Sequence, residues 1–572
     1  MYKYQLLLLT ISLPMYLPLK AQLPKRFDLV ITELFADPSP SVGLPASEFI
    51  ELKNISPVAI AMRNWKISDG NSTAVINFNY LLQPDSFLII CPTTAVNFFS
   101  VFGTTVGVSG FPSLNNEADI ISLYSPEGLI MHAVGYTDAW YRNDLKAVGG
   151  WTLEMIDPKN PCGGSSNWGA SINNKGGTPG ANNSIDGINR DDQPPAFIRS
   201  YTIDSVTIVA VFDESLDSTQ AANSSNYHLN NALGSIQSAS PLPPLFTEVQ
   251  LRLNYILKAE TVYLLTINDV NDCAGNTIGV MNSAKAGLPL TAGLRDIILN
   301  ELLFNPKTDG YDYVEFYNRS NKIIDFKQLY TANKNTTSAF TNIHQIIPAS
   351  FLCFPGEFIV ITENIKWVQQ NYVVKVPGQL IQMNQLPSLP DDKGNIVVMN
   401  FQGKVVDELS YEQNWHFPLI DNKEGVALER INYDEPTQEK TNWTSAASTA
   451  GFGTPTIQNS QFRADLQLQA QISVYPKIFS PDNDGIDDFA TIHCTLTQPG
   501  YVATISIFDV AGRVVKSLVR NATLSSTGIF RWDGLNDQQQ RLPTGMYIIL
   551  TEIFNLQGKT KKFKNIVALG RR

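Results

Sequence analysis

The sequence is poor in the residue types that carry most enzyme chemistry. Asp, Glu, Lys and Arg make up 17 % of its 572 residues, and it has five histidines and five cysteines. The histidines are isolated from one another: His132, His228, His344, His416 and His493. The sequence contains no H-E-x-x-H, G-x-S-x-G or G-x-x-x-x-G-K motif. The sequence therefore offers no motif that would indicate a hydrolase, a zinc peptidase or a nucleotide-dependent enzyme.

The cysteines show no metal-binding or framework spacing. Cys91, Cys162, Cys273, Cys353 and Cys494 are spread over the whole chain without a C-x-x-C pair. This spacing argues against a zinc site and against a dense disulfide framework. Because the number is odd, at least one cysteine stays free or pairs with another molecule. We expect most of them to be small buried hydrophobic side chains.

Basic charge and long apolar runs are also scarce. The net charge is -11 and the isoelectric point is about 5.1, which argues against a protein that holds nucleic acid or an anionic membrane by charge. The short run from Lys559 to Lys564 is the one basic exception. After the first residues, no segment has the roughly 20 apolar residues of a membrane span. We predict no nucleic-acid partner and no transmembrane segment.

The first residues, MYKYQLLLLTISLPMYLPLKAQ, indicate a secretory signal peptide. An early lysine precedes an apolar run, and the small residue Ala21 offers a cleavage site. The alternative is a membrane anchor, but Pro14 and Pro18 interrupt the run and it is short for a span of about 20 residues. We predict a signal peptide over residues 1–21 and an exported mature chain in an oxidising compartment.

The residues that are abundant favour β-structure. Thr, Ser, Asn, Val, Ile, Tyr and Phe recur throughout, a composition typical of strands and polar turns. The length predicts three to five domains of roughly 100 to 200 residues each.

The chain repeats itself at domain length. NELLFNPKTDGYDYVEFYN (300–318) echoes TELFADPSPSVGLPASEFIELKN (32–54), and Glu154, Trp140 and Trp168 recur 275 positions later as Glu429, Trp415 and Trp443. Within each copy, segments such as EFIELKN and DYVEFYN alternate as strands do, and Gly, Pro, Asn and Asp cluster between them. We predict a sandwich of two sheets in each copy, with a short helix at about 94–102 and 363–371.

These segments resemble the bacterial lamin-tail domain. The resemblance is carried by the openings ITELFADP and LNELLFNP, the strands EFIELKN and DYVEFYN, the NW near each end and the terminal GGTPG. It covers residues 27–185 in full and residues 294–460 more weakly, with GFGTPT at the second end. The resemblance implies an immunoglobulin-like sandwich that serves as an interaction or targeting module, often beside exported nucleases or phosphatases. We expect each Gly-rich end to turn out into a linker.

A third unit, residues 193–290, follows a DDQPP linker. VTIVAVFDESLD and VQLRLNYIL alternate as half-buried strands. With Phe212 to Glu214 early and Asp272 to Asn276 late, the unit resembles immunoglobulin-like domains of bacterial surface proteins. The resemblance implies a spacer.

Residues 466–572 form a last unit with its own pattern. VAGR between two alternating runs indicates a hairpin, and LPTGMYIIL indicates a turn that leads into an inner strand. The segments Phe479 to Asp488, Asp509 to Arg513, Trp532 to Gly534 and Pro543 to Tyr547 resemble the C-terminal sorting domains of secreted Bacteroidetes proteins. That resemblance implies type IX secretion across the outer membrane and frequent removal of the domain at the surface.

Two acidic patterns could carry chemistry. Glu33 with Glu51, and Glu301 with Glu315, recur in both copies and could act as paired acids in hydrolysis. However, neighbouring strands often bring glutamates to one exposed face, and no His or Cys partner recurs with them. We predict that these pairs are not catalytic, and we predict no catalytic residue elsewhere.

The segment SPDNDGIDD surrounds Gly485 with Asp482, Asp484, Asp487 and Asp488. Calcium prefers carboxylate oxygens gathered by a tight turn, so these four residues are the candidate metal ligands. The segment lacks the full twelve-residue loop, and the alternative is a solvated Asp-Gly turn. No other cofactor is predicted.

Trp140 and Trp415 are the candidate ligand-binding residues, because aromatic rings near turns can stack on sugars or protein partners. Their recurrence at equivalent positions also fits a role in the core.

The sequence as a whole predicts an all-β chain of tandem immunoglobulin-like sandwiches, secreted or attached to the cell surface. We expect a non-enzymatic role in adhesion or assembly, with surface proteins or glycans as partners and with the secretion machinery recognising residues 466–572. The alternative is an exported hydrolase of the nuclease or phosphatase type, or its accessory subunit.

Overall fold

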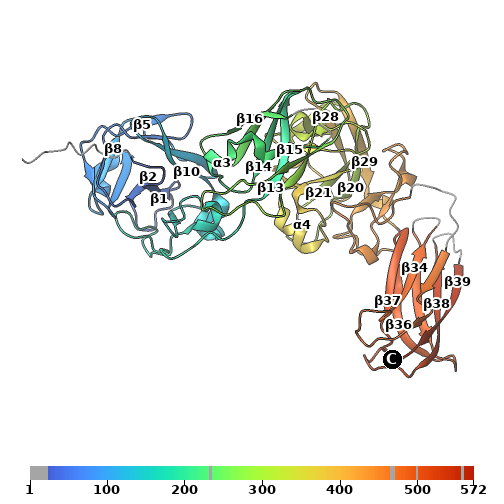
Figure 1. Cartoon of the computed structure of the whole chain (residues 1–572). Coiled ribbons are helices and arrows are strands. Elements are labelled where there is room, and N and C mark those ends of the chain that lie inside the picture. The colour runs from blue at the N-terminus through green and yellow to red at the C-terminus, as the bar shows by residue number, and fades with distance from the viewer. Residues whose placement is uncertain (1–23, 231–234, 464–470, 497–499, 556–559, 572) are drawn as a thin grey trace, which may run out of the picture.

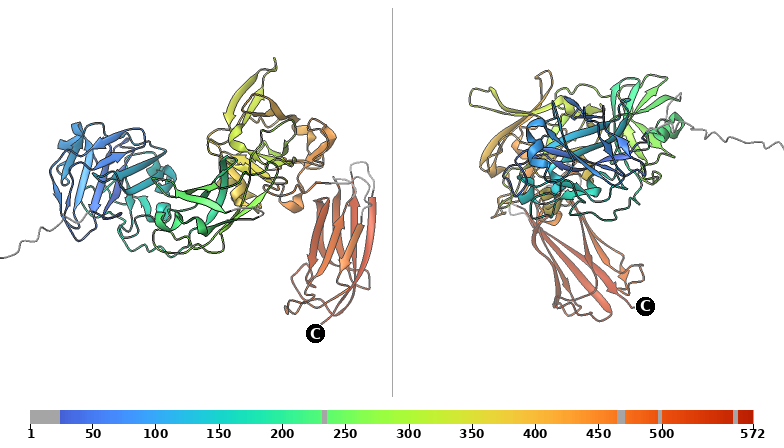
Figure 2. Two further views of the ribbon diagram at one scale, coloured as in Figure 1. Left: turned by 45° about the horizontal axis from the view of Figure 1, so that its top comes forward. Right: turned by 90° about the vertical axis from the view of Figure 1, so that its left-hand side faces the viewer.

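The computed structural model describes residues 24–230, 235–463, 471–496, 500–555 and 560–571. The predicted signal peptide, residues 1–21, lies outside them. Sheets dominate and helices are few and short (Figure 1). The predicted all-β fold of tandem sandwiches is therefore confirmed. Four units follow one another along the chain, and the last one bends away from the row (Figures 1 and 2).

The first sandwich (residues 29–187) has a six-stranded and a four-stranded sheet. The larger sheet runs in the order β12 (Trp168–Ala170), β11 (Leu153–Met155), β1 (Leu29–Phe35), β2 (Phe49–Asn54), β7 (Phe87–Pro92) and β8 (Thr105–Val108). The smaller sheet runs in the order β10 (Ile130–Thr137), β9 (Ala118–Tyr124), β4 (Lys66–Ser68) and β5 (Thr73–Val75), and β3 (Ile60–Ala61) pairs with β6 (Leu81–Leu82). Two short helices, α1 (Val96–Phe99) and α2 (Asp144–Ala147), complete the unit. Apolar residues that alternate along the strands, with Trp65 and Trp168 among them, fill the space between the sheets.

The spacer (residues 197–286) is a smaller sandwich. One sheet has the order β13 (Phe197–Asp204), β14 (Thr207–Phe212), β17 (Glu248–Leu253) and β16 (Ile236–Pro241), and the other has the order β15 (Tyr227–Leu229), β18 (Tyr263–Ile267) and β19 (Ser283–Ala286). The helix α3 (Ser218–Ala221) is capped by Asp217. A salt bridge between Lys285 and Glu357, 2.6 Å long, joins the spacer to the next unit.

The second sandwich (residues 297–463) repeats the strand order of the first. Its larger sheet reads β31 (Trp443–Ser445), β30 (Leu428–Arg430), β20 (Ile297–Leu303), β21 (Tyr313–Asn318), β26 (Phe358–Thr362) and β27 (Leu380–Gln382). The smaller sheet contains β24 (Phe340–Gln345), β23 (Leu329–Lys334), β28 (Lys393–Asn400) and β29 (Val405–Glu412), and β22 (Ile324–Asp325) pairs with β25 (Leu352–Cys353). In each sandwich a helix follows the same strand of the larger sheet, α1 after β7 and α4 (Ile365–Asn371) after β26, and both helices lie where the sequence predicts.

The tail domain (residues 471–569) has two sheets that enclose Trp532. The smaller sheet has the order β32 (Gln471–Tyr475), β34 (Ala490–Thr495) and β37 (Thr527–Trp532). The larger one has the order β33 (Ile478–Phe479), β39 (Thr560–Leu569), β38 (Gly545–Phe554), β35 (Val502–Phe508) and β36 (Val514–Thr523). The hairpin predicted around VAGR joins β35 to β36.

Candidate functional site

Each large sandwich contains a row of three buried glutamates. In the first sandwich, Glu33 on β1 pairs in register with Glu51 on β2 and with Glu154 on β11. The flanking residues Leu34 and Leu153 belong to the sandwich core, so the alternation of a strand turns the glutamates to the opposite face of the sheet. All three side chains are completely buried.

The second sandwich has the same row. Glu301 on β20 pairs with Glu315 on β21 and with Glu429 on β30, and all three are completely buried. The sequence led us to expect these glutamates on an exposed face, and that expectation is wrong. The third glutamate of each row, Glu154 or Glu429, stood out in the sequence only because it recurs in both copies.

A segment that we call the terminal strap covers each row. It comprises residues 176–187 in the first sandwich and residues 452–463 in the second. In the first strap, the Thr178 N–H donates to Glu33 Oε1 at 2.8 Å and the Gly180 N–H donates to Glu51 Oε2 at 2.6 Å. Ser184 Oγ donates to Glu154 Oε2 at 2.7 Å. The Gly-rich ends therefore do not turn out into linkers, as expected, because they fold back over the sheet to supply donors to the carboxyl groups.

The second strap makes the same contacts 276 positions later. The Thr454 N–H donates to Glu301 Oε1 at 2.9 Å, and the Thr456 N–H donates to Glu315 Oε2 at 2.5 Å. Ser460 Oγ donates to Glu429 Oε2 at 2.8 Å. The repeated G-T-P motif is thus explained by hydrogen bonds to the glutamate row.

The geometry at Thr454 requires a bound proton. Its Oγ1 lies 2.7 Å from Glu301 Oε2 and 2.8 Å from Glu429 Oε1. A hydroxyl group has a single hydrogen and can donate it to only one of these oxygens. The other carboxyl group must therefore be protonated and donate to the hydroxyl oxygen.

Burial favours the protonated form of these acids. Desolvation raises the pKa of Glu51 and of Glu429 to about 8. It also raises the pKa of Glu33 and Glu315 well above the usual range, and in both cases a neighbouring glutamate of the row raises it further. Each row therefore keeps protons at neutral pH.

The glutamate rows have no room for a substrate. A Cβ atom on Gly177 of the strap would lie 2.7 Å from Glu33 Oε1 and 2.7 Å from Leu44 Cδ1. The strap is thus in direct contact with the carboxyl groups. We interpret the rows as fasteners that hold the strap to the sheet.

The two candidate tryptophans occupy equivalent places. Trp140 lies in a short 3-10 helix (Asp138–Tyr141) after β10, and Trp415 lies in another (Gln413–Trp415) after β29. Both are partly buried and pack against the core of their sandwich, and the rings of Trp140 and Trp168 are 6.3 Å apart. This placement accounts for their recurrence by packing, and contact with a ligand stays a prediction.

The acidic loop of the tail domain brings three of its four candidates together. One oxygen each from Asp482, Asp484 and Asp488 lies within 4.8 Å of the others, and Asp487 is not part of this group. Within the loop, Asp488 accepts the backbone N–H groups of Asn483 and Gly485 at 2.7 and 2.9 Å. These bonds build an Asp-Gly turn without a cation, and calcium binding stays a prediction.

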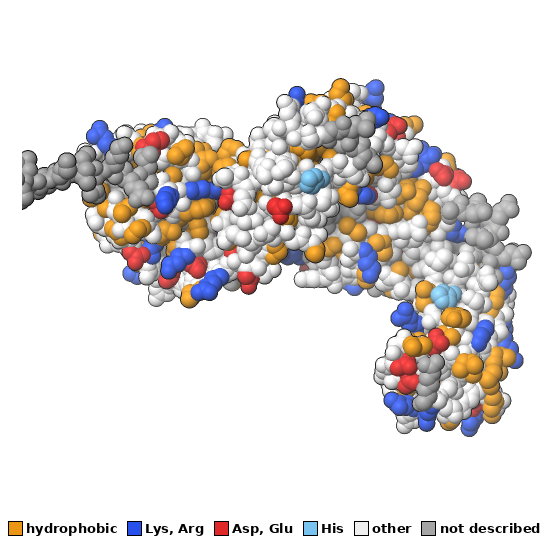
Figure 3. Space-filling view, in the orientation of Figure 1, with side chains coloured by type: hydrophobic (Ala, Val, Ile, Leu, Met, Phe, Trp, Pro, Cys, Tyr) orange, Lys and Arg blue, Asp and Glu red, His pale blue; other side chains and the backbone are white. Residues whose placement is uncertain are grey.

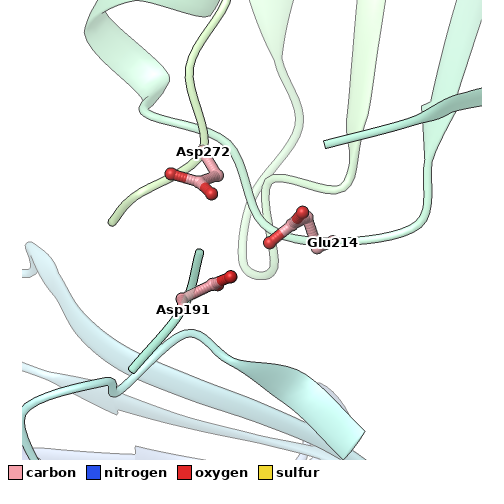
Figure 4. A group of neighbouring side chains, drawn as sticks. All are labelled: Asp191, Glu214 and Asp272. Carbon is pink, nitrogen blue, oxygen red and sulfur yellow. The ribbon is translucent and has the colours of Figure 1, made fainter. Parts of the chain in front are cut away.

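A second acidic group, which the sequence did not indicate, lies between the first sandwich and the spacer. Asp191 comes from the connecting segment, Glu214 follows β14 and Asp272 follows β18, and their carboxyl groups face one another (Figure 4). One carboxylate oxygen from each of the three residues lies within 4.8 Å of the others. Burial, followed by repulsion from Asp191 and Asp272, raises the pKa of Glu214 to about 8. The two spacer motifs thus meet, since Glu214 of the first lies beside Asp272 of the second.

A disulfide bond beside this acidic group ties the two units together. Cys162 of the first sandwich is bonded to Cys273 of the spacer, and the other three cysteines are free and buried. Nearby, the guanidinium group of Arg26 lies 4.6 Å from the ring centre of Phe246 in the spacer. The expectation of small buried side chains is correct for three cysteines, and the spacing could not reveal the pair because it joins two domains.

The fold and these sites define a multidomain protein of immunoglobulin-like β-sandwiches with fastened terminal straps. Family comparisons identify two of its parts. The Lamin Tail Domain model matches residues 24–138, and the CHU_C Type IX secretion signal domain model matches residues 473–569. The second match supports export and a secreted or cell-surface location. Among the described residues, we find no helix with the length and apolar character of a membrane span.

Solved structures that resemble the chain do so at low identity. They include the bacterial S-layer protein rSbsC(31-844), with 11 % identity, 66 % of this chain and 54 % of that chain covered and a TM-score of 0.16. Dimeric latent PorU from Porphyromonas gingivalis has 11 % identity, coverage of 68 % and 33 %, and a TM-score of 0.15. A tetra-tandem repeat of a large adhesion protein has 10 % identity, coverage of 95 % and 100 %, and a TM-score of 0.14. This chain thus spans about half or less of the S-layer and PorU chains. The comparison with curated proteins gave no match.

Proposed function

We propose that this protein is a non-enzymatic scaffold of the bacterial cell surface that makes adhesive or assembly contacts with surface proteins or glycans. The observation that carries the proposal is that the repeated glutamates have a structural role. The carboxyl groups that recur in both sandwiches hold the terminal straps and are closed off from solvent.

We also propose that the second sandwich is a second lamin tail domain. Its strand order, the register of its three glutamates and the contacts of its strap match those of the first sandwich. Duplication of a rigid unit lengthens a protein and multiplies its contact surfaces. On the face shown in Figure 3, charges of both signs are interspersed along the row of domains, as expected of a surface exposed to solvent.

The tail domain supplies the route out of the cell in this proposal. It packs on the second strap, where the Ser526 N–H donates to the Ser460 carbonyl oxygen at 2.8 Å and Gln461 Nε2 donates to the Leu524 carbonyl oxygen at 3.1 Å. In its own cells, the protein is expected to be accessible to protease on intact cells. Deletion of residues 466–572 is expected to retain it in the periplasm.

The test measures protease accessibility and mass with and without the tail domain. Loss of surface exposure on deletion would support export by the tail. Periplasmic residence of both forms would overturn this part of the proposal. Turnover of a nucleic acid or a phosphate ester by the purified protein would overturn the non-enzymatic assignment in favour of an exported hydrolase.

A further inference from the structure

The five-stranded sheet of the tail domain is apolar on both of its faces. Successive side chains of a strand point to opposite faces, and Tyr547, Ile549 and Val567 belong to the domain core. Their neighbours along β38 and β39 therefore face outward. An antiparallel sheet with one face in water usually carries polar side chains there, whereas several outward residues of this sheet are large and apolar.

The strand register places these outward side chains in two adjacent rows across the sheet. In the first row, Ala568 on β39 is paired with Ile478 on β33 and with Met546 on β38. The second row crosses β39, β38, β35 and β36, and it consists of Ile566, Ile548, Phe508 and Val514. We call these seven residues the apolar band.

The apolar band is open to solvent. The exposed fraction of the side chain is 67 % for Ile478, 50 % for Met546 and Ile566, and 54 % for Val514. The other three members of the band are partly exposed. Soluble proteins rarely expose a contiguous apolar patch without a use for it, and such patches mark interaction sites.

The apolar band lies at the free tip of the molecule. Its residues come from the strand ends beside the turn 509–513 and beside Gly570. Contacts with the second sandwich are made at the opposite end of the domain, by Thr523, Leu524 and Ser526. The C-terminus marks the tip in Figure 1, and hydrophobic side chains gather near it on the face shown in Figure 3. Because the band stays exposed in the whole described chain, no other described unit covers it.

Charges of both signs surround the apolar band without entering it. Arg513 and Asp509 form a salt bridge with each other at 2.8 Å. Lys477 and Lys564 flank the band and form no salt bridge among the described residues. The acidic loop 482–488 follows β33 at the same end of the domain. Since no sign of charge dominates, the band suits a partner surface that is itself apolar and uncharged.

We propose that the apolar band is the surface by which the tail domain docks on a protein component of the export machinery, against an apolar, uncharged surface of that component. This inference rests on the proposed function, because it names the contact through which the tail directs export. The position at the free tip leaves the band accessible while the other three units are folded.

A second copy of the chain fits the apolar band less well. Each side of a standard stable interface contributes roughly 20 to 30 residues, and the band has seven. A contact of this size suits a transient encounter, such as the one that an export signal makes and then leaves.

The experiment measures export of the full chain in its own cells, as protein accessible to protease on intact cells. Ile566→Lys and Val514→Lys each place a charge in the band at an exposed position, so the core is unchanged. We expect each variant to lower surface exposure by about tenfold and to accumulate in the periplasm. Ile529→Lys is the matched control, because Ile529 lies on β37 in the other sheet of the same domain and is 60 % exposed. It should be exported as the wild type is.

Thermal unfolding of each purified variant shows whether it is folded. Normal export of either folded band variant would overturn the docking surface and leave the export role of the tail intact. Equal retention of Ile529→Lys would also overturn the assignment to the band. Unchanged location after deletion of residues 466–572 would instead overturn the proposed function, so the two failures are distinguishable. Self-association of the purified wild type in sedimentation that Ile566→Lys abolishes would transfer the band to a second copy.

Discussion

Glu51 offers the sharpest test of the glutamate rows, because its burial determines whether the free energy of unfolding rises or falls with pH. Its pKa is raised from 4.5 to about 8, so the folded state keeps a proton that the unfolded chain releases. Between these two values the folded state binds more protons, and the free energy of unfolding falls as the pH rises. The stabilisation is fully present below pH 4.5 and is lost as the pH rises through about 8. At about 1.4 kcal/mol per pKa unit, the shift corresponds to a loss of about 5 kcal/mol.

The substitution Glu51→Gln removes this titration and keeps an oxygen for the Gly180 N–H. The assay is hydrogen exchange of residues 176–187, read by mass spectrometry from about pH 5 to about pH 9 and corrected for the intrinsic rate. In the wild type we expect protection of the strap to fall with rising pH. In the variant we expect a smaller fall, because the Glu51 contribution is removed while Glu33 still titrates, and we expect protection above the wild-type value at alkaline pH.

Glu117→Gln, at an exposed glutamate of the same sandwich, is the matched control and should keep the wild-type slope. Protection of the wild-type strap that does not change with pH would refute the reasoning. So would a Glu51→Gln variant with an unchanged slope, because the proton would then reside elsewhere.

Three further substitutions test the straps and the junction, each by calorimetric unfolding. Thr454→Val removes the hydroxyl group between two carboxyl groups and should cost about 1 to 3 kcal/mol, whereas no loss would contradict the shared proton. Gly180→Ala places a Cβ 2.3 Å from a backbone oxygen at a residue with φ +81°. It should lower the free energy of unfolding by more than the roughly 1 kcal/mol expected of Gly70→Ala, where φ is +86° but no atom lies close to the added Cβ. Equal losses in the two variants would contradict the close approach at Gly180. Cys162→Ser opens the cross-link to Cys273 over a separation of 111 residues and should lower stability by about 4 to 5 kcal/mol, which an unchanged transition would contradict.

The fold was largely predictable because strands and repeats leave local patterns. The alternation in EFIELKN and DYVEFYN predicts β2 and β21, and the shared spacing of Trp168 and Trp443 predicts two related cores. The helices α1 and α4 were predictable because each directly follows a strand segment that recurs in both copies, FLII in the first and FIVI in the second.

The burial of the glutamates under the terminal straps was not predictable from the local sequence pattern. Thr178 lies 145 residues after Glu33, and only the folded chain shows that one covers the other. A comparison of the two copies offered one signal, since Glu154 and the G-T-P motif recur together.

The junction between the first sandwich and the spacer was hidden for the same reason. Asp191, Glu214 and Asp272 come from three separate segments, and the Cys162–Cys273 bond joins two domains. Neither leaves a spacing that a single sequence can reveal.

Infrared spectroscopy of the buried carboxyl groups tests the central claim most directly. The account holds that the repeated glutamates keep protons at neutral pH and fasten the straps. It predicts an absorption band of protonated carboxyl groups at pH 7 that persists in heavy water and loses intensity in Glu51→Gln and in Glu429→Gln. A spectrum with only ionised carboxylates, unchanged by both substitutions, would contradict it.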